Sequence, residues 1–387
     1  MKITGLFLVF LILFSGCSVS RPIETEPAAV PVMAEATLPP ATQAPSPTTE
    51  VVETDPLEQL LSRMTVEERV GQLFLARCPE DGSLEDLRKY HLGGYILFGR
   101  DIKGHTPASL SRTIASWQSA SGIPMLIAVD EEGGTVCRLS NVHTFRDEPF
   151  PSPRALYDSG GMELVLEAEA EKASMLKNAG INVNMAPVCD IATIPWAFMY
   201  PRSLGQSPEV TAEFIAGTVA ALSDHQIGSV LKHFPGYGNN SDTHTGTARD
   251  PRTLEELESA DLLPFQAGID AGCGAILMSH TIADALDPEL PVSLSPAAHT
   301  YLRENMDFDG VIVTDDLAMA AITNAYGSAD AAVLAVLAGN DLLCSTNYAT
   351  QYQAVLDAIA SGRIPMETID AAALRVLRWK QALGLLP

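Results

Sequence analysis

The chain has 387 residues, of which 47% are hydrophobic and 19% are charged, and its formal net charge is −24. This composition is typical of a globular protein with enough apolar material for a large core. Nucleic-acid binding requires clustered Lys and Arg side chains that neutralise phosphates, and the sequence contains no basic run. We therefore exclude nucleic acid as a partner.

The first 17 residues have the features of a targeting segment. A single basic residue, Lys2, precedes the apolar stretch Leu6–Phe14, which is too short to span a bilayer. Small residues then lead directly to Cys17, and this arrangement resembles a bacterial lipoprotein signal, in which the cysteine is lipidated. A plain secretory signal with an incidental cysteine and an uncleaved membrane anchor are the alternatives. We predict an extracytoplasmic protein that contacts the membrane only through its lipid anchor.

Residues 18–55 form the second segment and are rich in Pro, Thr, Ala and Glu. They show no periodic apolar pattern, so they cannot bury enough surface to offset the entropy cost of ordering the chain. We predict a disordered tether that holds one folded domain, residues 56–387, away from the membrane.

Five cysteines remain when Cys17 is set aside, and none forms a CxxC pair. The odd number argues against a disulfide framework. Cys137, Cys189 and Cys344 lie in or beside apolar runs, where a cysteine usually acts as a small buried hydrophobic residue.

Eight short apolar runs alternate with longer helical patterns in the folded part. Because the runs are continuously hydrophobic rather than alternating, they indicate strands buried on both faces, as in a parallel sheet. Together with the helices they predict an α/β fold, a single (β/α)8 TIM-type barrel. The predicted strands are Leu73–Ala76, Gly94–Phe98, Met125–Val129, Ile181–Met185, Val230–Leu231, Ala275–Met278, Val311–Val313 and Asp341–Leu343. The predicted helices are Leu57–Val70, Met162–Ala179, Pro208–His225, Leu254–Ala271, Ala329–Ala338, Gln351–Ala360 and Ile369–Leu383.

Polar residues follow five of the predicted strands, at the end of a barrel where active sites lie. Burying a charge costs several kcal/mol unless partners compensate, so charge at the end of a buried strand indicates pairing or chemistry. The residues concerned are Asp130, Asp190, Lys232 with His233, Ser279 with His280, and Asp315 with Asp316.

The roles of these residues stay open at the level of residue type. Asp315 could be a nucleophile, a base or a metal ligand, whereas Asp316 is expected to cap the following helix. Asp242 and His244 lie two apart in a polar loop, which fits either a solvated turn or a histidine that an aspartate orients for acid/base catalysis. Metal and cofactor motifs of known spacing do not occur, so neither group is expected.

Four motifs, in this order, resemble glycoside hydrolase family 3, and most closely its β-N-acetylglucosaminidase branch. They are Ala128–Gly134, Pro201–Gly205, Lys232–Gly236 with the Asp242–Thr243–His244 loop, and Phe308–Leu317. The resemblance implies that Asp315 is the nucleophile and that His244 with Asp242 forms the acid/base dyad. It also implies sugar-binding roles for Asp130, Arg138, Arg202, Lys232 and His233. The sequence departs from this branch at Tyr237, where a histidine is usual, and in a loop that is one residue shorter.

The function implied by the resemblance is that of a retaining exo-β-N-acetylglucosaminidase that works through a covalent glycosyl-enzyme. An enzyme tethered outside the cell meets cell-wall fragments, so the expected substrate is terminal GlcNAc on peptidoglycan-derived muropeptides or related oligosaccharides. The alternatives are a family 3 β-glucosidase, a GlcNAc phosphorylase and a non-catalytic sugar-binding lipoprotein.

Overall fold

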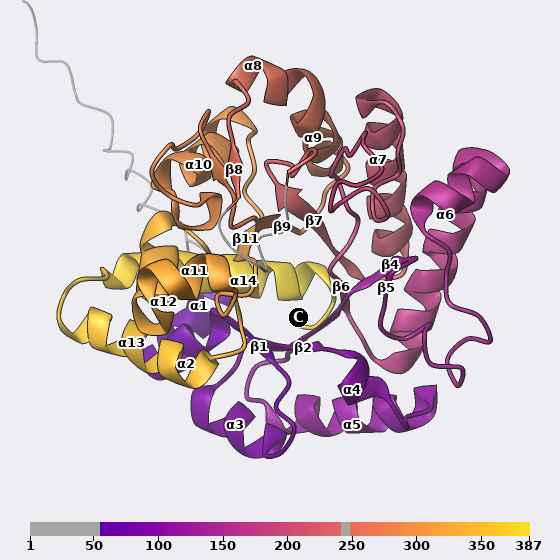
Figure 1. Ribbon diagram of the computed structural model, residues 1–387. Coiled ribbons are helices and arrows are strands. Elements are labelled where there is room, and N and C mark those ends of the chain that lie inside the picture. Colours follow the sequence, from indigo (N-terminus) through magenta and orange to yellow (C-terminus); the bar gives the residue numbers. More distant parts are fainter. Residues whose placement is uncertain (1–54, 241–247) are drawn as a thin grey trace, which may run out of the picture. The chain divides into compact units, whose positions relative to one another are not determined.

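The folded part of the chain is a parallel barrel of eight strands surrounded by helices (Figure 1). The computed structural model describes residues 55–240 and 248–387. The strands are hydrogen-bonded in the order β11-β9-β7-β6-β3-β2-β1-β12, and a bridge between Val313 and Leu342 links the two ends of this order. The predicted α/β barrel is therefore confirmed. The strands are β1 (Phe74–Arg77), β2 (Gly94–Leu97), β3 (Leu126–Val129), β6 (Val183–Asn184), β7 (Gly228–Phe234), β9 (Ala275–Met278), β11 (Val311–Thr314) and β12 (Leu343–Ser345).

Every predicted run corresponds to one of these strands, with two informative shifts. Strand β7 is longer than its apolar run, so Lys232 and His233 lie within the strand rather than after it. Strand β12 begins at Leu343 rather than at Asp341, whose carboxylate accepts a hydrogen bond from the Ile312 N–H at 2.9 Å. Four short strands lie outside the barrel, namely β4 (Glu131–Gly133), β5 (Val136–Cys137), β8 (Arg249–Asp250) and β10 (Ile282–Ala283).

Two predicted helices are interrupted for local reasons. The segment predicted as Leu57–Val70 consists of α1 (Pro56–Arg63) and α2 (Val66–Gln72), because Thr65 and Glu68 form a reciprocal capping box that starts a new helix. The segment predicted as Leu254–Ala271 contains a π-helical turn between α8 and α9. The remaining helices are α3 (Ser83–Tyr90), α4 (Gly99–Ile102), α5 (Pro107–Ala120), α6 (Pro153–Ala179), α7 (Pro208–Asp224), α8 (Leu254–Glu256), α9 (Leu262–Asp270), α10 (Pro296–Thr300), α11 (Ala320–Tyr326), α12 (Ser328–Ala338), α13 (Tyr348–Ala360) and α14 (Met366–Ala382).

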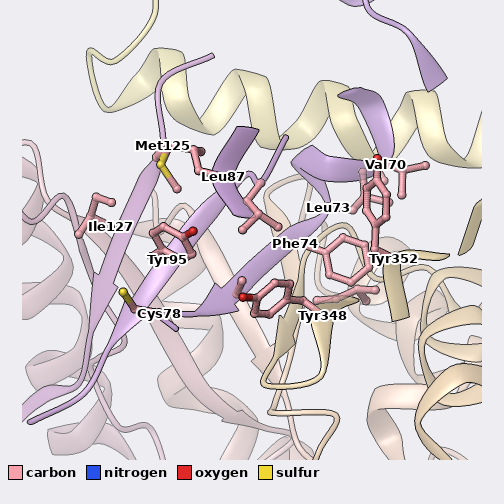
Figure 2. Packing of buried hydrophobic residues seen from close by; sticks show 14 of the residues in the cluster. Val70, Leu73, Phe74, Cys78, Leu87, Tyr95, Met125, Ile127, Tyr348 and Tyr352 are labelled. Carbon is pink, nitrogen blue, oxygen red and sulfur yellow. The ribbon is translucent and has the colours of Figure 1, made fainter. Parts of the chain in front are cut away.

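The core has an inner and an outer layer because successive strand residues point to opposite faces. Leu75, Ile96 and Ala128 belong to a cluster inside the barrel. Their neighbours along the strands, such as Phe74 and Tyr95, pack against the helices, and Figure 2 shows part of this outer layer. Both layers exclude water, which explains why the strand sequences are continuously hydrophobic.

The cysteines of the folded part are buried and unpaired, which confirms the interpretation of Cys137, Cys189 and Cys344 as small buried side chains. Burial raises the pKa of Cys78 and of Cys273 to about 12, so these thiols stay protonated at neutral pH.

Within the described ranges, no single helix is both long and apolar enough to cross a membrane. Helices α11 and α12 pass such a test only when taken together, and they are bent by 102° relative to each other.

Candidate active site

A pocket of about 590 Å³ opens at the carboxyl ends of the barrel strands. Its volume lies within the range of small-molecule sites, roughly 300–1,000 Å³. Each of the eight barrel strands, or the residue that follows it, supplies part of the lining. The predicted site residues that line it are Asp130, Arg138, Arg202, Lys232, His233 and Asp315. The fold therefore brings together six residues that the sequence spreads over 186 positions, from 130 to 315.

Lys232, on β7, contacts two acidic side chains from the segment that follows β3. Its Nζ lies 2.7 Å from Asp130 Oδ1 and 2.6 Å from Glu132 Oε1. Burial by itself lowers the pKa of Lys232, but the two carboxylates outweigh burial and raise the pKa above its ordinary value. The side chain is therefore a fixed ammonium group at physiological pH.

Glu132 joins Lys232 to Arg202 from a fully buried position. Arg202 donates to both oxygens of this carboxylate, from Nε at 2.8 Å and from Nη2 at 2.6 Å. Burial by itself raises the pKa of Glu132, but Lys232 and Arg202 hold that pKa well below its usual range. Glu132 is therefore ionised at neutral pH and cannot act as a general acid. Glu132 lies within the Ala128–Gly134 motif, but the sequence analysis assigned no binding role to this residue.

Glu131 faces away from the pocket and shapes the loop that carries Arg138. Its carboxylate accepts hydrogen bonds from the backbone N–H groups of Arg138 at 2.9 Å and of Leu139 at 2.7 Å. Between these residues lies the β4–β5 hairpin, in which Gly133 and Gly134 have φ values of 99° and 65°. Glycine adopts such angles without steric cost, which accounts for the Gly-Gly pair in this motif.

His233 is oriented by Asp190, a buried residue that the sequence analysis named only as a charge after a predicted strand. His233 Nδ1 lies 2.7 Å from Asp190 Oδ2, and Arg202 Nη2 lies 3.4 Å from His233 Nε2. Because a guanidinium group can only donate, Nε2 acts as the acceptor and the ring proton lies on Nδ1, facing Asp190. Tyr237, where relatives of this branch usually have histidine, packs edge-on against His233 with ring centroids 5.3 Å apart.

Asp315 directly follows β11 and lines the pocket at the carboxyl ends of the barrel strands. Its backbone N–H donates to the Met278 carbonyl at 3.2 Å, and its Oδ1 accepts from the Asp316 N–H at 2.8 Å. These contacts tie both the backbone and the carboxylate of Asp315 to the end of the strand.

The expectation that Asp316 caps the next helix is wrong. Helix α11 begins only at Ala320, and Met319 precedes it. The Asp316 carboxylate instead accepts hydrogen bonds from Thr346 Oγ1 at 2.5 Å and from the Ala318 N–H at 2.9 Å. Asp316 thus connects the end of β11 to the segment after β12, because a polar partner across the barrel rim outcompetes a local helix cap.

Asp242 and His244, the predicted acid/base dyad, lie outside the described residues. Described residues on either side of this segment form hydrogen bonds with other parts of the domain. Asn239 Oδ1 accepts from the Thr193 N–H at 3.0 Å, and β8 pairs with β10 from Arg249 onward. Cys17 also lies outside the described residues.

A barrel whose strand ends gather fixed cations and carboxylates in one pocket is typical of enzymes that act on polar small molecules. Comparison with known proteins identifies the class further. The model of the glycosyl hydrolase family 3 N-terminal domain matches residues 65–379. The chain belongs to this family and is a glycoside hydrolase.

Similar proteins include a β-hexosaminidase from Xanthomonas campestris pv. campestris (strain B100), 36% identical over 300 residues, which are 76% of this chain and 87% of that protein. The structure of a family 3 β-N-acetylglucosaminidase from Paenibacillus sp. str. FPU-7 is 34% identical with a TM-score of 0.77, and the match covers 83% of this chain and 63% of that one. The structure of M. tuberculosis LpqI is 26% identical with a TM-score of 0.77, and the match covers 84% and 96% of the two chains.

Proposed function

We propose that the protein is a retaining exo-β-N-acetylglucosaminidase that removes terminal GlcNAc through a covalent glycosyl-enzyme. The observation that carries the proposal is the position of Asp315, at the end of a barrel strand in a pocket whose other wall holds ionised Lys232 and Arg202. The activities of the similar proteins, named β-hexosaminidase and β-N-acetylglucosaminidase, support the same sugar specificity.

In this mechanism Asp315 attacks the anomeric carbon and displaces the aglycone. His244, oriented by Asp242, protonates the leaving oxygen and later removes a proton from the attacking water. A histidine has an ordinary pKa of about 6.5, so it is partly protonated near neutral pH without a large shift.

The wall of Lys232, Arg202, His233 and Asp130 would bind the hydroxyl groups of the sugar. The Lys232 ammonium has three N–H donors, and two of them face the carboxylates of Asp130 and Glu132, which leaves one for a ligand. Because each of these side chains is held by a buried partner, the sugar would be oriented without further ordering of the protein, and this lowers the barrier to attack.

The proposed substrates are peptidoglycan-derived muropeptides and related oligosaccharides, which an extracytoplasmic lipoprotein would encounter. The cysteine at position 17 is the proposed lipid attachment point. Cys17→Ala is expected to release the protein from the membrane fraction or to block its processing. A processed variant that still sediments with membranes would contradict the anchor.

A panel of nitrophenyl glycosides tests the sugar specificity. The β-N-acetylglucosaminide should be turned over faster than the β-glucoside, and NMR of the first product formed should show the β-anomer. Faster turnover of the β-glucoside, or an initial α-anomer, would contradict the proposal. The same assay with inorganic phosphate distinguishes hydrolysis from phosphorolysis, because only the latter yields a sugar 1-phosphate.

A further inference from the structure

Two arginine side chains lie over one aromatic ring at the edge of the pocket. The ring is that of Phe98, which follows β2. The guanidinium carbon of Arg77, the last residue of β1, lies 4.6 Å from the ring centroid, and that of Arg138 lies 5.3 Å from it. All three residues line the same pocket as Asp315.

The other cations of the pocket are already neutralised by acidic partners. Lys232 contacts Asp130 and Glu132, and Arg202 forms a two-pronged pair with Glu132. Arg138 has a weaker partner, with its Nη2 lying 3.6 Å from Asp130 Oδ2.

Arg77 differs from these three cations. Within residues 55–240 and 248–387 its side chain makes no hydrogen bond or ion pair, whereas Arg138, whose Nε is likewise a buried donor without an acceptor, still lies near the carboxylate of Asp130. The chain contains 48 acidic residues and only 24 Lys and Arg residues, so an arginine without an acidic partner is unexpected on composition. A buried donor that lacks an acceptor is destabilising unless a ligand or water satisfies it.

The cation–π contact with Phe98 does not satisfy the N–H donors of Arg77, because the ring supplies no acceptor oxygen or nitrogen. A planar guanidinium group whose N–H donors lack acceptors matches the two oxygens of a carboxylate or a phosphate. Arg138, on the same ring, adds positive charge to this edge of the pocket.

We propose that Arg77, supported by Arg138, binds an anionic substituent of the sugar substrate, a carboxylate or a phosphate. This inference rests on the proposed glycosidase function and specifies the charge of the substrate. In the bound complex the anion would accept hydrogen bonds from the guanidinium edge that the protein leaves without a partner.

The experiment compares three nitrophenyl β-N-acetylglucosaminides in the wild-type protein. One is neutral, one carries a phosphate at the sugar 6-position, and one carries a carboxylate on the aglycone ring. A higher kcat/KM for the phosphate ester places the anion on the sugar, and a higher value for the carboxylate places it on the leaving group. Equal values for all three substrates would overturn the inference.

Arg77→Gln is the informative variant, and Arg112→Gln, on the exposed face of α5, is its matched control. A hydrogen-bonded charge pair corresponds to about a ten- to hundredfold effect, so Arg77→Gln should reduce the preference for the charged substrate by that factor. Arg112→Gln should keep the wild-type preference, and Arg77→Lys should restore part of it.

The outcome separates this inference from the proposed function. If the wild-type protein hydrolyses the neutral substrate but Arg77→Gln lowers kcat/KM equally for neutral and charged substrates, the anion site is wrong and the glycosidase stands. If no β-N-acetylglucosaminide is hydrolysed, the proposed function itself fails.

Discussion

Two fully buried lysines, one at each end of the barrel, show how differently the fold treats the same ammonium group. At the mouth, Lys232 Nζ contacts two carboxylates, and its pKa is raised above the ordinary value. At the other end, Lys380 on α14 donates a hydrogen bond to the amide oxygen of Gln72 at 2.6 Å, and burial lowers its pKa to about 7.

The difference between Lys232 and Lys380 shows that a buried positive charge is stabilised at the pocket end of the barrel. A buried charge is costly unless acidic partners surround it, and among the described residues such partners lie beside Lys232 but not beside Lys380. The charged form of Lys232 is thus stabilised by acidic residues at the pocket. At the opposite end of the barrel, Lys380 is buried without such residues and can lose its proton.

Removing the proposed nucleophile, Asp315, should have the largest effect while leaving the ion pairs around Lys232 intact. Asp315→Asn is expected to reduce turnover of a nitrophenyl β-N-acetylglucosaminide by about 10⁴-fold or more. The melting temperature should stay close to that of the wild type, because Asp315 is only partly buried at the pocket. A 2-acyl-5-fluoro sugar should label Asp315 in mass spectrometry, and labelling of Asp316 instead would refute the assignment.

Removing the proposed proton carrier should affect substrates unequally. His244→Ala is expected to lose about 10²–10⁴-fold on a sugar leaving group. With a dinitrophenyl leaving group, which needs little protonation, a burst of released phenol should appear because the glycosyl-enzyme accumulates. Asp242→Asn should show a milder form of the same pattern. Equal losses on both substrates would indicate a role in binding rather than in proton transfer.

Glu132→Gln should remove one of the two carboxylates beside Lys232, so that the surroundings of Lys232 become more like those of Lys380. Breaking a buried ion pair on one side typically costs about 3–5 kcal/mol in the free energy of unfolding, and KM should rise because Arg202 loses its support. Glu171→Gln is the matched control, since Glu171 pairs with Arg146 at the surface and should cost less than about 1 kcal/mol. Similar losses in the two variants would show that the wall is not held by Glu132.

The same variant has a predictable pH dependence. The pKa of Glu132 is lowered on folding, so its stabilising contribution is present above the unfolded value of about 4.3 and is lost as pH falls through the folded pKa. The difference in unfolding free energy between the wild type and Glu132→Gln, measured by urea denaturation, should therefore shrink as pH falls below about 4.3. A difference that stays constant down to pH 3 would contradict the ionised state of Glu132.

The smallest effect is expected at the opposite end of the barrel. The folded pKa of Lys380, about 7, lies below the ordinary value of about 10.4, so the unfolded chain holds the proton more tightly and stability rises with pH between these values. Lys380→Met should raise the melting temperature by a few degrees at pH 6, and this gain should decline toward pH 10. Lys177→Met, at an exposed site on α6, should show no such trend. A gain that is independent of pH would mean that Lys380 does not titrate in this range.

The barrel and the end of the barrel at which the candidate pocket opens could be predicted from the sequence. Strand character depends on short apolar runs, and helix ends depend on local caps, so both can be seen within a few residues. The polar residues at the strand ends, such as Lys232 and Asp315, were found because charge directly after a buried strand is unusual. The helix break at Thr65 and Glu68 was missed, although the capping pair is visible in the sequence.

The pairing of these charged residues with one another could be seen only in the tertiary structure. Glu132 and Arg202 are 70 residues apart, and Asp190 and His233 are 43 apart, so no local pattern links them. The same holds for Asp316, which bonds Thr346 rather than the nearest helix, and for Arg77, whose missing partner is apparent only once its neighbours are known. The physical reason is that hydrophobic periodicity acts along the chain, whereas ion pairs form between strand ends that meet only when the barrel closes.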